Sequence, residues 1–348
     1  MSTVVTVPAI RFKDAQIDMA HGAGGTASRR LVEGLIVPLL SGPANRTLDD
    51  AAIVSVNGQP IAITSDSFVV NPLRFPGGSI GELAVNGTVN DLAVAGARAI
   101  ALVTTFVLEA GLPTAVLEAE VRAMARASER AGVSIVGGDT KVVEHGKADG
   151  LYITTTGIGA PLSGVSLNAR SVRPGDQVIL SGPIGDHGIT ILLARGELEL
   201  EADLRSDTRS VFPLVERLVE IAGPAVRWMR DPTRGGVATS LNELARDCGL
   251  CIEISEDAVP VNEAVRGACE LLGLDPLHIA NEGQCIAIVD PAAADDAVQA
   301  LHSVPGGERA CIVGAVRPQP AGVVMTNTSY GATRIVDMLV GDPLPRIC

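Results

Sequence analysis

Aromatic residues are scarce in this chain, since Phe, Tyr and Trp make up only 2% of its 348 residues. The core must therefore be packed from Val, Ile, Leu and Ala. Basic residues are outnumbered, and the formal net charge of −13 argues against a protein that binds nucleic acid. No apolar run reaches about 18 residues and the N-terminus lacks a basic, then hydrophobic pattern, so no membrane span is predicted and a cytoplasmic protein is expected.

Cysteine gives little sign of a metal site or a disulfide framework. Most of the six cysteines lie in apolar runs and are predicted to be reduced core residues. Cys248 and Cys251 form a C-x-x-C, but no second pair and no nearby pair of histidines completes a zinc site.

What the chain does have is an alternation of strand-like and helix-like segments, long enough for two domains. This pattern predicts an α/β (α+β) fold with an N-terminal domain over 1–160, a C-terminal domain over 161–340 and a tail over 341–348. Strands are predicted at 3–7, 49–56, 61–68, 101–108, 133–136, 151–159, 176–181, 226–230, 250–254, 284–289 and 309–316. Helices are predicted at 28–36, 79–97, 112–130, 188–195, 210–221, from 235, 261–272 and 292–302.

A glycine-rich loop, His21-Gly22-Ala23-Gly24-Gly25, precedes the first predicted helix. Free backbone amides at a helix start suit an anion such as phosphate, although such a loop is equally often a flexible turn. The Walker pattern is absent. The loop fits G-x-G-x-x-A, but no convincing strand precedes it, so a dinucleotide site is weakly supported.

Acidic side chains gather at strand ends and along one helix. Asp49, Asp50 and Asp66 lie at predicted strand ends, and Asp231 ends another strand just before Gly235 and Gly236. Within the helix predicted from Ser79 to Ala97, the residues Glu82, Asn86, Asn90 and Asp91 form a polar stripe with no Lys or Arg to neutralise it. A solvent-facing stripe is one interpretation. The other is a Mg²⁺–phosphate site, because this hard cation prefers oxygen ligands.

The last residues read Gly341-Asp-Pro-Leu-Pro-Arg-Ile-Cys348. The prolines at 343 and 345 predict a semi-rigid, extended arm that leaves the preceding helix and ends in a thiol. Such an arm can carry its sulfur into a pocket without unfolding the domain, but a disordered chain end is an equally good interpretation of the residues alone.

Taken in order, these motifs resemble the AIR-synthase (PurM-like) superfamily. The resemblance covers the chain from about His21 to Cys348, and its motifs are His21-Gly-Ala-Gly-Gly, Asp49-Asp50-Ala-Ala, Thr64-Ser-Asp66, Asn90-Asp91-Leu-Ala, Gly137-Gly138-Asp139-Thr140 and Asp231-Pro-Thr233-Arg-Gly-Gly. The ending Pro345-Arg346-Ile347-Cys348 is similar to the tail of the HypE family of hydrogenase maturation. Selenophosphate synthetase typically has a cysteine or selenocysteine where this chain has Gly25.

The resemblance implies a two-domain PurM-like fold that dimerises through its N-terminal sheet. It also implies a carbamoyl dehydratase that modifies its own tail. A HypF-type carbamoyltransferase would carbamoylate Cys348, and ATP with Mg²⁺ would drive dehydration to a thiocyanate. The cyano group would then pass to iron on a HypC–HypD complex for the [NiFe]-hydrogenase centre. The tail is expected to have an outward and an inserted state.

The resemblance further implies a role for each candidate residue. Asp50, Asp66, Asp91 and Asp231 would bind Mg²⁺, and Cys348 would carry the reacting group. Bases for the dehydration would be Glu282, Lys141 and, behind them, His21; the alternatives are surface charge or a salt bridge for the first two and fixing the loop for His21. The nucleotide would contact Gly22, Ala23, Gly24, Gly25, Asp49, Asn90, Gly138, Thr140 and Thr233.

Two other functions fit the same residues. A small-molecule kinase or synthetase of this superfamily would leave Cys348 incidental. A non-catalytic, ATP-gated scaffold would bind nucleotide and partner proteins without modifying the tail.

Overall fold

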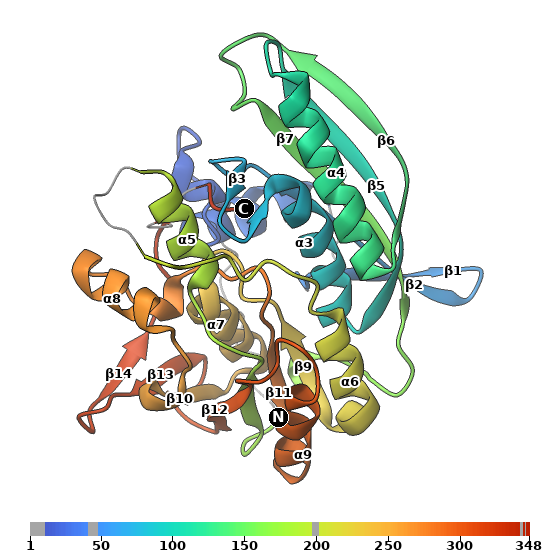
Figure 1. The fold of residues 1–348 in the computed structure, drawn as a ribbon. Coiled ribbons are helices and arrows are strands. Elements are labelled where there is room, and N and C mark those ends of the chain that lie inside the picture. The colour runs from blue at the N-terminus through green and yellow to red at the C-terminus, as the bar shows by residue number, and fades with distance from the viewer. Residues whose placement is uncertain (1–10, 41–47, 197–201, 342–343, 345) are drawn as a thin grey trace.

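The computed structural model describes residues 11–40, 48–196, 202–341, 344 and 346–348. Two β-sheets with their helices lie one above the other, and the C-terminus lies between α5 and α3 (Figure 1). The strand predicted at 3–7 and the prolines at 343 and 345 lie outside the described residues. No helix in the described part of the chain combines the length and the hydropathy that crossing a membrane requires.

The first sheet has five strands in the order β1-β2-β7-β5-β6. Its strands are β1 (Ala52–Val56), β2 (Gln59–Phe68), β5 (Ala97–Glu109), β6 (Ser134–Val143) and β7 (Leu151–Pro161). All neighbours are antiparallel except β5 and β6. Helices α3 (Ile80–Val94) and α4 (Thr114–Ala131) lie on one face of the sheet. A short hairpin of β3 (Arg74–Phe75) and β4 (Gly78–Ser79) precedes α3, and α4 connects β5 to β6.

The second sheet has seven strands in the order β14-β13-β10-β12-β8-β11-β9. They are β8 (Gln177–Leu180), β9 (Val226–Arg230), β10 (Cys251–Ser255), β11 (Ile286–Val289), β12 (Cys311–Arg317), β13 (Val323–Asn327) and β14 (Thr333–Val336). Its helices are α5 (Asp186–Ala194), α6 (Phe212–Ala222), α7 (Gly236–Cys248), α8 (Glu263–Leu272) and α9 (Ala294–His302). Every residue of β11 is buried, which explains its continuous apolar run.

The N-terminal segment crosses to the C-terminal half. It contains a 3₁₀ turn (η1, Met19–Gly22), α1 (Thr26–Leu31), a π-helical stretch (η2, Val32–Ile36) and α2 (Val37–Leu40). The first amides of α1 bind the chain beyond β14: Thr26 N donates to Leu339 O at 2.9 Å, and Ala27 N to Val340 O at 3.2 Å. The beginning and the end of the chain are thereby joined.

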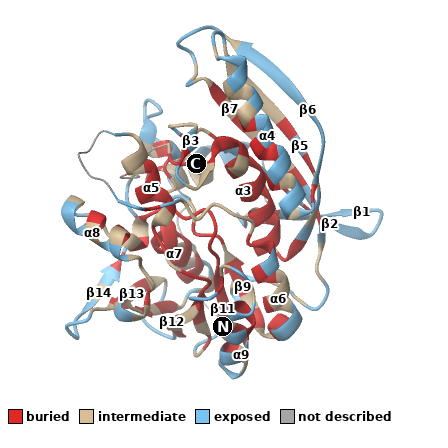
Figure 2. Cartoon of the chain, in the orientation of Figure 1, coloured by how far each residue is buried: buried red, intermediate tan, exposed pale blue. Residues whose placement is uncertain are grey.

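Helix α3 is the central joint between the two halves, and nearly all of it is buried (Figure 2). Gly81 lets α4 come close, since a Cβ there would lie 2.4 Å from Glu120 O. Asn90 binds the second half: its Nδ2 donates to Arg209 O at 3.0 Å and to Glu282 O at 3.3 Å, and its Oδ1 accepts from Val211 N at 2.8 Å. One amide side chain thus fixes α3 against two segments of the C-terminal half.

The predicted α+β architecture is confirmed. The predicted helix over 79–97 is α3, shortened by the glycine at position 96 that turns the chain into β5. The prediction that the tail leaves a helix is wrong, because the last regular element before it is strand β14. The predicted domain boundary after residue 160 falls at the end of the first sheet.

Candidate active site

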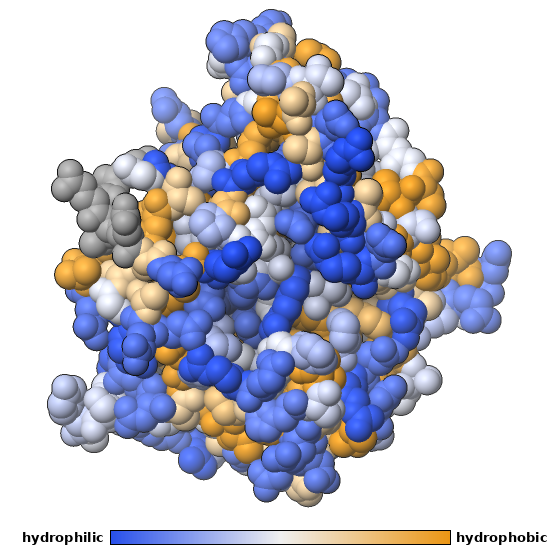
Figure 3. All heavy atoms as spheres, viewed as in Figure 1, coloured by the Kyte–Doolittle hydropathy of each residue, from blue (hydrophilic) through white to orange (hydrophobic). Residues whose placement is uncertain are grey.

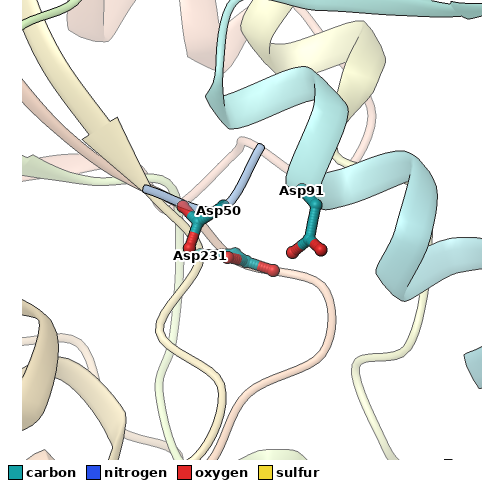
Figure 4. A group of neighbouring side chains, drawn as sticks. All are labelled: Asp50, Asp91 and Asp231. Atoms are coloured by element: carbon teal, nitrogen blue, oxygen red, sulfur yellow. The ribbon is translucent and has the colours of Figure 1, made fainter. Parts of the chain in front are cut away.

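Three aspartates distant in the sequence meet in space (Figure 4). Asp50 precedes β1, Asp91 lies near the end of α3, and Asp231 follows β9. One carboxylate oxygen from each lies within 4.8 Å of the others. We call these three residues the acidic cluster. Thr64 links two of them, because its Oγ1 lies 2.8 Å from both Asp50 O and Asp91 Oδ2.

The acidic cluster lines a cavity of about 260 Å³ between the two halves, here called the acidic pocket. Asp66 and Thr233, two of the candidate residues, also line it, and Gly24 is the member of the glycine-rich loop that reaches it. Arg234 Nη1 donates to Gly22 O at 3.2 Å and so ties the loop to the pocket wall. The pocket is therefore lined mainly by polar side chains, and the glycine-rich loop forms part of its wall.

Burial and mutual repulsion make the acidic cluster electrostatically unfavourable without a cation. Burial raises the pKa of Asp91 well above its usual value, and the nearby Asp231 and Asp50 raise it further. Burial also raises the pKa of Asp231 well above normal, again with a contribution from Asp50. Carboxylates packed in this way are stabilised by a bound metal ion.

The carboxylates fit Mg²⁺ in ligand type and spacing. Mg²⁺ binds oxygen at about 2.1 Å in an octahedron, so neighbouring ligand oxygens lie about 3 to 4 Å apart. The observed separations of up to 4.8 Å need only a small closure. Asp66 lies on the same wall but outside the acidic cluster, and its Oδ1 accepts from Ser67 N at 2.8 Å.

An arginine neutralises part of this charge, which the sequence analysis missed. Arg230 Nη1 donates to Asp50 Oδ1 at 2.6 Å, and its Nη2 lies 3.5 Å from Glu243 Oε2. The signal was present, because Arg230 and Arg234 flank Asp231 in the sequence. The view that no cation accompanies the acidic residues was also wrong within α3, where Glu82 pairs with Arg130 at 2.9 Å.

Glu282 is buried next to the acidic cluster, on the turn that joins a short 3₁₀ helix (η6, Pro276–His278) to β11. Burial raises its pKa well above the usual value, with further increases from Asp231 and Asp66. Its backbone is fixed on both sides, since Asp207 Oδ1 accepts from Glu282 N at 3.0 Å and Asn90 donates to Glu282 O. A raised pKa makes the ionised carboxylate a stronger proton acceptor.

The expectation of free backbone amides at the start of the first helix is wrong, whereas the phosphate contact of the loop stays a prediction. The first amides of α1 are not free to bind an anion, because the chain at Leu339 and Val340 occupies them. Gly24 N is likewise bound, donating to Ser28 Oγ at 2.9 Å. Asn90 serves as the joint described above, and its contact with a nucleotide stays a prediction.

Gly138, Thr140 and Lys141 lie on β6, away from the acidic cluster. The strand register runs from Asp66 through Thr155 and Thr104 to Gly138, which places Gly138 three strands away, about 14 Å. A Cβ at Gly138 would lie 1.8 Å from Thr104 O, so close packing of β5 and β6 requires glycine here. Lys141 Nζ pairs with Asp139 at 2.6 Å on this exposed strand.

His21 and Asp49 lie outside the acidic pocket. His21 is buried and supports the loop: its Nε2 donates to Asp14 Oδ2 at 2.9 Å, while its Nδ1 accepts from Asp18 N at 3.0 Å. The hydrogen bond with Asp14 raises the pKa of His21. Asp49 is exposed and lines a separate small cavity with Leu167 and Trp228. The geometry thus favours the loop-fixing interpretation of His21.

The end of the chain is inserted between the two halves. Val69 N donates to Cys348 O at 2.9 Å and Asn71 N to Arg346 O at 3.3 Å, so the tail runs alongside the residues that follow β2. Ile347 and Cys348 are 2% and 8% exposed. Because Val69 lies three residues after Asp66, the thiol-bearing residue lies next to the strand that contributes to the acidic pocket.

Comparison with known proteins gives one consistent result. Residues 48–160 match the family described as AIR synthase related protein, N-terminal domain, and residues 173–327 match its C-terminal domain. The chain is 46% identical over 335 residues to carbamoyl dehydratase HypE of Rhizobium leguminosarum bv. viciae, covering 96% of both chains.

Solved structures agree. A HypE–HypF complex matches with a TM-score of 0.84 at 42% identity, covering 89% of this chain and 99% of that one. A HypE in complex with ATP matches with a TM-score of 0.80 at 44% identity, covering 96% and 100%.

Proposed function

This chain belongs to the HypE carbamoyl dehydratase family of AIR synthase related proteins, and we propose that it dehydrates a carbamoyl group carried on its own Cys348. The reaction of the family is ATP-dependent and serves hydrogenase maturation. The observation that carries the proposal is the inserted tail, whose terminal residue is hydrogen-bonded to Val69, just beyond the strand that bears Asp66.

The chemistry requires activation of a poor leaving group. The thiocarbamate S–C(=O)–NH₂ attacks the γ-phosphorus of ATP through its oxygen, and ADP leaves as the new O–P bond forms. Loss of one N–H proton gives an imidate phosphate. Loss of the second N–H proton, together with cleavage of the C–O bond, releases phosphate and leaves the thiocyanate S–C≡N. Orientation and charge neutralisation are the main demands of the phosphoryl transfer.

We assign the proton acceptor to Glu282. It is buried next to the acidic cluster, its pKa is raised, and its backbone is held by Asp207 and Asn90. Lys141 is a weaker candidate, because its ammonium group pairs with Asp139 on an exposed strand three strands from β2.

Asp50, Asp91 and Asp231 are the residues we expect to bind Mg²⁺, with Asp66 beside them. When bound, Mg²⁺ would neutralise phosphate charge and orient the triphosphate. Arg230 compensates part of the charge on Asp50. The nucleotide phosphates would then lie in the acidic pocket, under Gly24 and near Thr233.

We predict opposite effects of Asp91→Asn on activity and on stability. Activity should fall on the order of 10²–10³-fold, because the metal loses a ligand. The metal-free protein should become more stable at neutral pH, because a buried charge that Asp231 and Asp50 repel is removed. Activity assays and thermal unfolding in EDTA measure the two effects.

The control is Asp176→Asn. Asp176 is a buried aspartate outside the site, and its carboxylate accepts from Arg173 N. This variant should leave the Mg²⁺ dependence of activity unchanged.

The same charges set the pH dependence of the metal-free protein. Since folding raises the pKa values of Asp91 and Asp231, the folded state binds more protons than the unfolded state. Their contribution to stability is therefore complete below the ordinary aspartate pKa near 4 and is lost as the pH rises through the raised values. Added Mg²⁺ should accordingly raise the melting temperature more at pH 8 than at pH 5. An equal increase at both pH values would contradict the metal assignment.

The proposed partners follow from the comparisons. A solved HypE–HypF complex supports a HypF-type carbamoyltransferase as the source of the carbamoyl group. A HypC–HypD iron scaffold is proposed as acceptor of the cyano group, because a thiocyanate needs a site that takes cyanide from sulfur.

A homodimer through the first sheet is also proposed. Among the described residues, no helix packs on the face opposite α3 and α4. Ile63 pairs with Ile158 on this face, and Val103 lies on the next strand. These side chains are 38%, 39% and 44% exposed. Hydrophobic residues gather at the right-hand margin of Figure 3, over this sheet. An exposed apolar sheet face of this kind is typical of a protein–protein interface.

Light scattering should show that the wild type is a dimer and that the double variant Ile158→Glu, Val103→Glu is a monomer. A monomeric wild type would contradict the proposed dimer.

The function is tested most simply by stoichiometry. When protein with a fully carbamoylated tail is mixed with excess Mg-ATP, each tail converted should yield one ADP and one phosphate in a single turnover. ADP formation that continues without loss of the carbamoyl group would overturn the proposal in favour of a separate substrate.

A further inference from the structure

His187 lies outside the acidic pocket and has no part in the chemistry above. It is the second residue of α5 and is completely buried, with its ring edge-on to Phe75 at a centroid distance of 5.6 Å. Burial lowers the pKa of His187 to about 4, so the ring is neutral at physiological pH.

One arrangement of protons satisfies every contact of this ring. His187 Nε2 lies 2.6 Å from Ile347 O, and because a carbonyl can only accept, Nε2 carries the proton. Nδ1 then accepts from the hydroxyl of Ser206 at 2.8 Å. The Ser206 oxygen in turn accepts from Thr208 N at 3.1 Å. A defined chain of hydrogen bonds therefore runs from the 206–208 segment through His187 to the tail.

Other contacts hold the tail on either side of this carbonyl. Arg195 Nη2 donates to Arg346 O at 2.9 Å, and the Arg346 guanidinium pairs with Asp149. Arg346 also has a positive φ of 58°, a conformation that persists only where surrounding contacts impose it. The carbonyl that His187 contacts belongs to the peptide bond between Ile347 and Cys348. The contact therefore sets the orientation of the peptide that carries the thiol-bearing residue.

The same segment that orients His187 also fixes the proposed base. Asp207, next to Ser206, accepts from Glu282 N at 3.0 Å and from Gly283 N at 3.1 Å. Thr208 binds α3, because Asn86 Nδ2 donates to its Oγ1 at 3.4 Å. Ser206 therefore connects through His187 to the inserted tail, Asp207 holds the turn of Glu282, and Thr208 contacts α3.

We propose that His187, oriented by Ser206, is a positioning residue that holds the tail in its inserted state and aligns Cys348 with Glu282. The proposal rests on the proposed function in one respect: it takes the inserted state as the one in which dehydration occurs. In this proposal the 206–208 segment keeps the inserted tail and Glu282 in a fixed position relative to each other.

The test is the rate at which iodoacetamide alkylates Cys348, measured by mass spectrometry of the C-terminal peptide. Alkylation needs an open tail, so its rate reports the opening equilibrium. His187→Leu should accelerate it about five- to tenfold, because the buried Ile347 carbonyl loses its donor. His187→Gln should restore slow alkylation, since its amide can place a donor near the position of Nε2. Ser206→Ala leaves the His187 ring in place and should accelerate alkylation to a smaller extent. It serves as the test if His187→Leu fails to fold.

The matched control is His302→Leu. His302 Nε2 also donates to a backbone carbonyl, that of Ala310 at 2.7 Å, but lies on α9 away from the tail. Its alkylation rate should equal that of the wild type. Unchanged alkylation in folded His187→Leu and Ser206→Ala would overturn the proposal.

The two half-reactions separate a positioning role from general damage to the fold. His187→Leu should slow dehydration of the carbamoylated tail, because the reacting group is no longer aligned with Glu282, whereas carbamoylation by a HypF-type enzyme should not slow, because it uses the outward tail. Equal loss of both half-reactions would indicate a structural role only. Since alkylation requires neither ATP nor a partner, a failed alkylation test in an active dehydratase overturns the positioning role alone. A tail that alkylates as predicted but is never dehydrated overturns the function alone.

Discussion

Replacing Cys348 by alanine is expected to abolish dehydration completely while ATP binding persists. The variant loses only the sulfur that carries the reacting group, and the acidic pocket has no contribution from this side chain. No core thiol can substitute, because burial raises the pKa values of Cys269 and Cys285 to about 11 and suppresses their thiolates. ATP consumption in the presence of a carbamoylating system should fall to the background rate.

Cys311→Ala is the matched control for this experiment. Cys311 is partly exposed, and its thiol donates to Ala258 O at 3.4 Å in the C-terminal half, so its loss should leave dehydration unchanged. If Cys348→Ala instead keeps an undiminished ATP-dependent turnover on a free carbamoyl compound, the chain is a small-molecule enzyme and the tail is incidental.

Glu282→Gln is expected to lower the rate of dehydration by about 10²–10⁴-fold, the usual contribution of a positioned general base. The substitution keeps the size of the side chain and the backbone contacts with Asp207 and Asn90. Binding of ATP and carbamoylation of Cys348 should therefore persist. In the wild type the single-turnover rate should rise with pH through the raised pKa of Glu282, because only the ionised carboxylate accepts a proton.

Glu120→Gln provides the comparison. Glu120 is fully buried on α4, where it accepts from Gly81 N at 3.1 Å and pairs with Arg74. This variant should lose stability without a specific loss of the dehydration step. A Glu282→Gln enzyme that dehydrates its tail at the wild-type rate and keeps the same pH profile would eliminate Glu282 as the base.

The acidic cluster is the part of the site that the sequence predicted best. Strand ends and the order of motifs indicated Asp50, Asp91 and Asp231, and the fold brings these three together within 4.8 Å. These residues meet because Asp50 and Asp231 lie at strand ends in the two halves and Asp91 lies near the end of the helix between the halves. Their role as metal ligands stays a prediction. The helix carrying Asp91 was likewise identified from its apolar residues.

Contacts between distant segments could not be predicted in this way. The amides of Thr26 and Ala27 are bound by residues more than three hundred positions later in the chain, so local sequence offered no sign that they were occupied. Gly138 belongs to one of the motifs that resemble the AIR-synthase superfamily, yet the constraint observed on it is the close approach of Thr104. The role of Asn90 likewise depends on Arg209 and Val211, which only the folded structure places beside it.

The tail was predicted from the sequence only in part. The terminal thiol was identified from the sequence, as was the existence of an inserted state. Which residues hold it there, His187 and Arg195 among them, depends on the arrangement of α5 against the end of β2. An isolated histidine in an apolar helix gave no signal for this contact.

The most direct measurement is the mass of the C-terminal peptide after incubation with a carbamoylating system, with and without Mg-ATP. The account predicts that Cys348 gains one carbamoyl group without ATP and that the adduct loses one water when Mg-ATP is added. A tail whose mass never changes while ATP is still hydrolysed would contradict it.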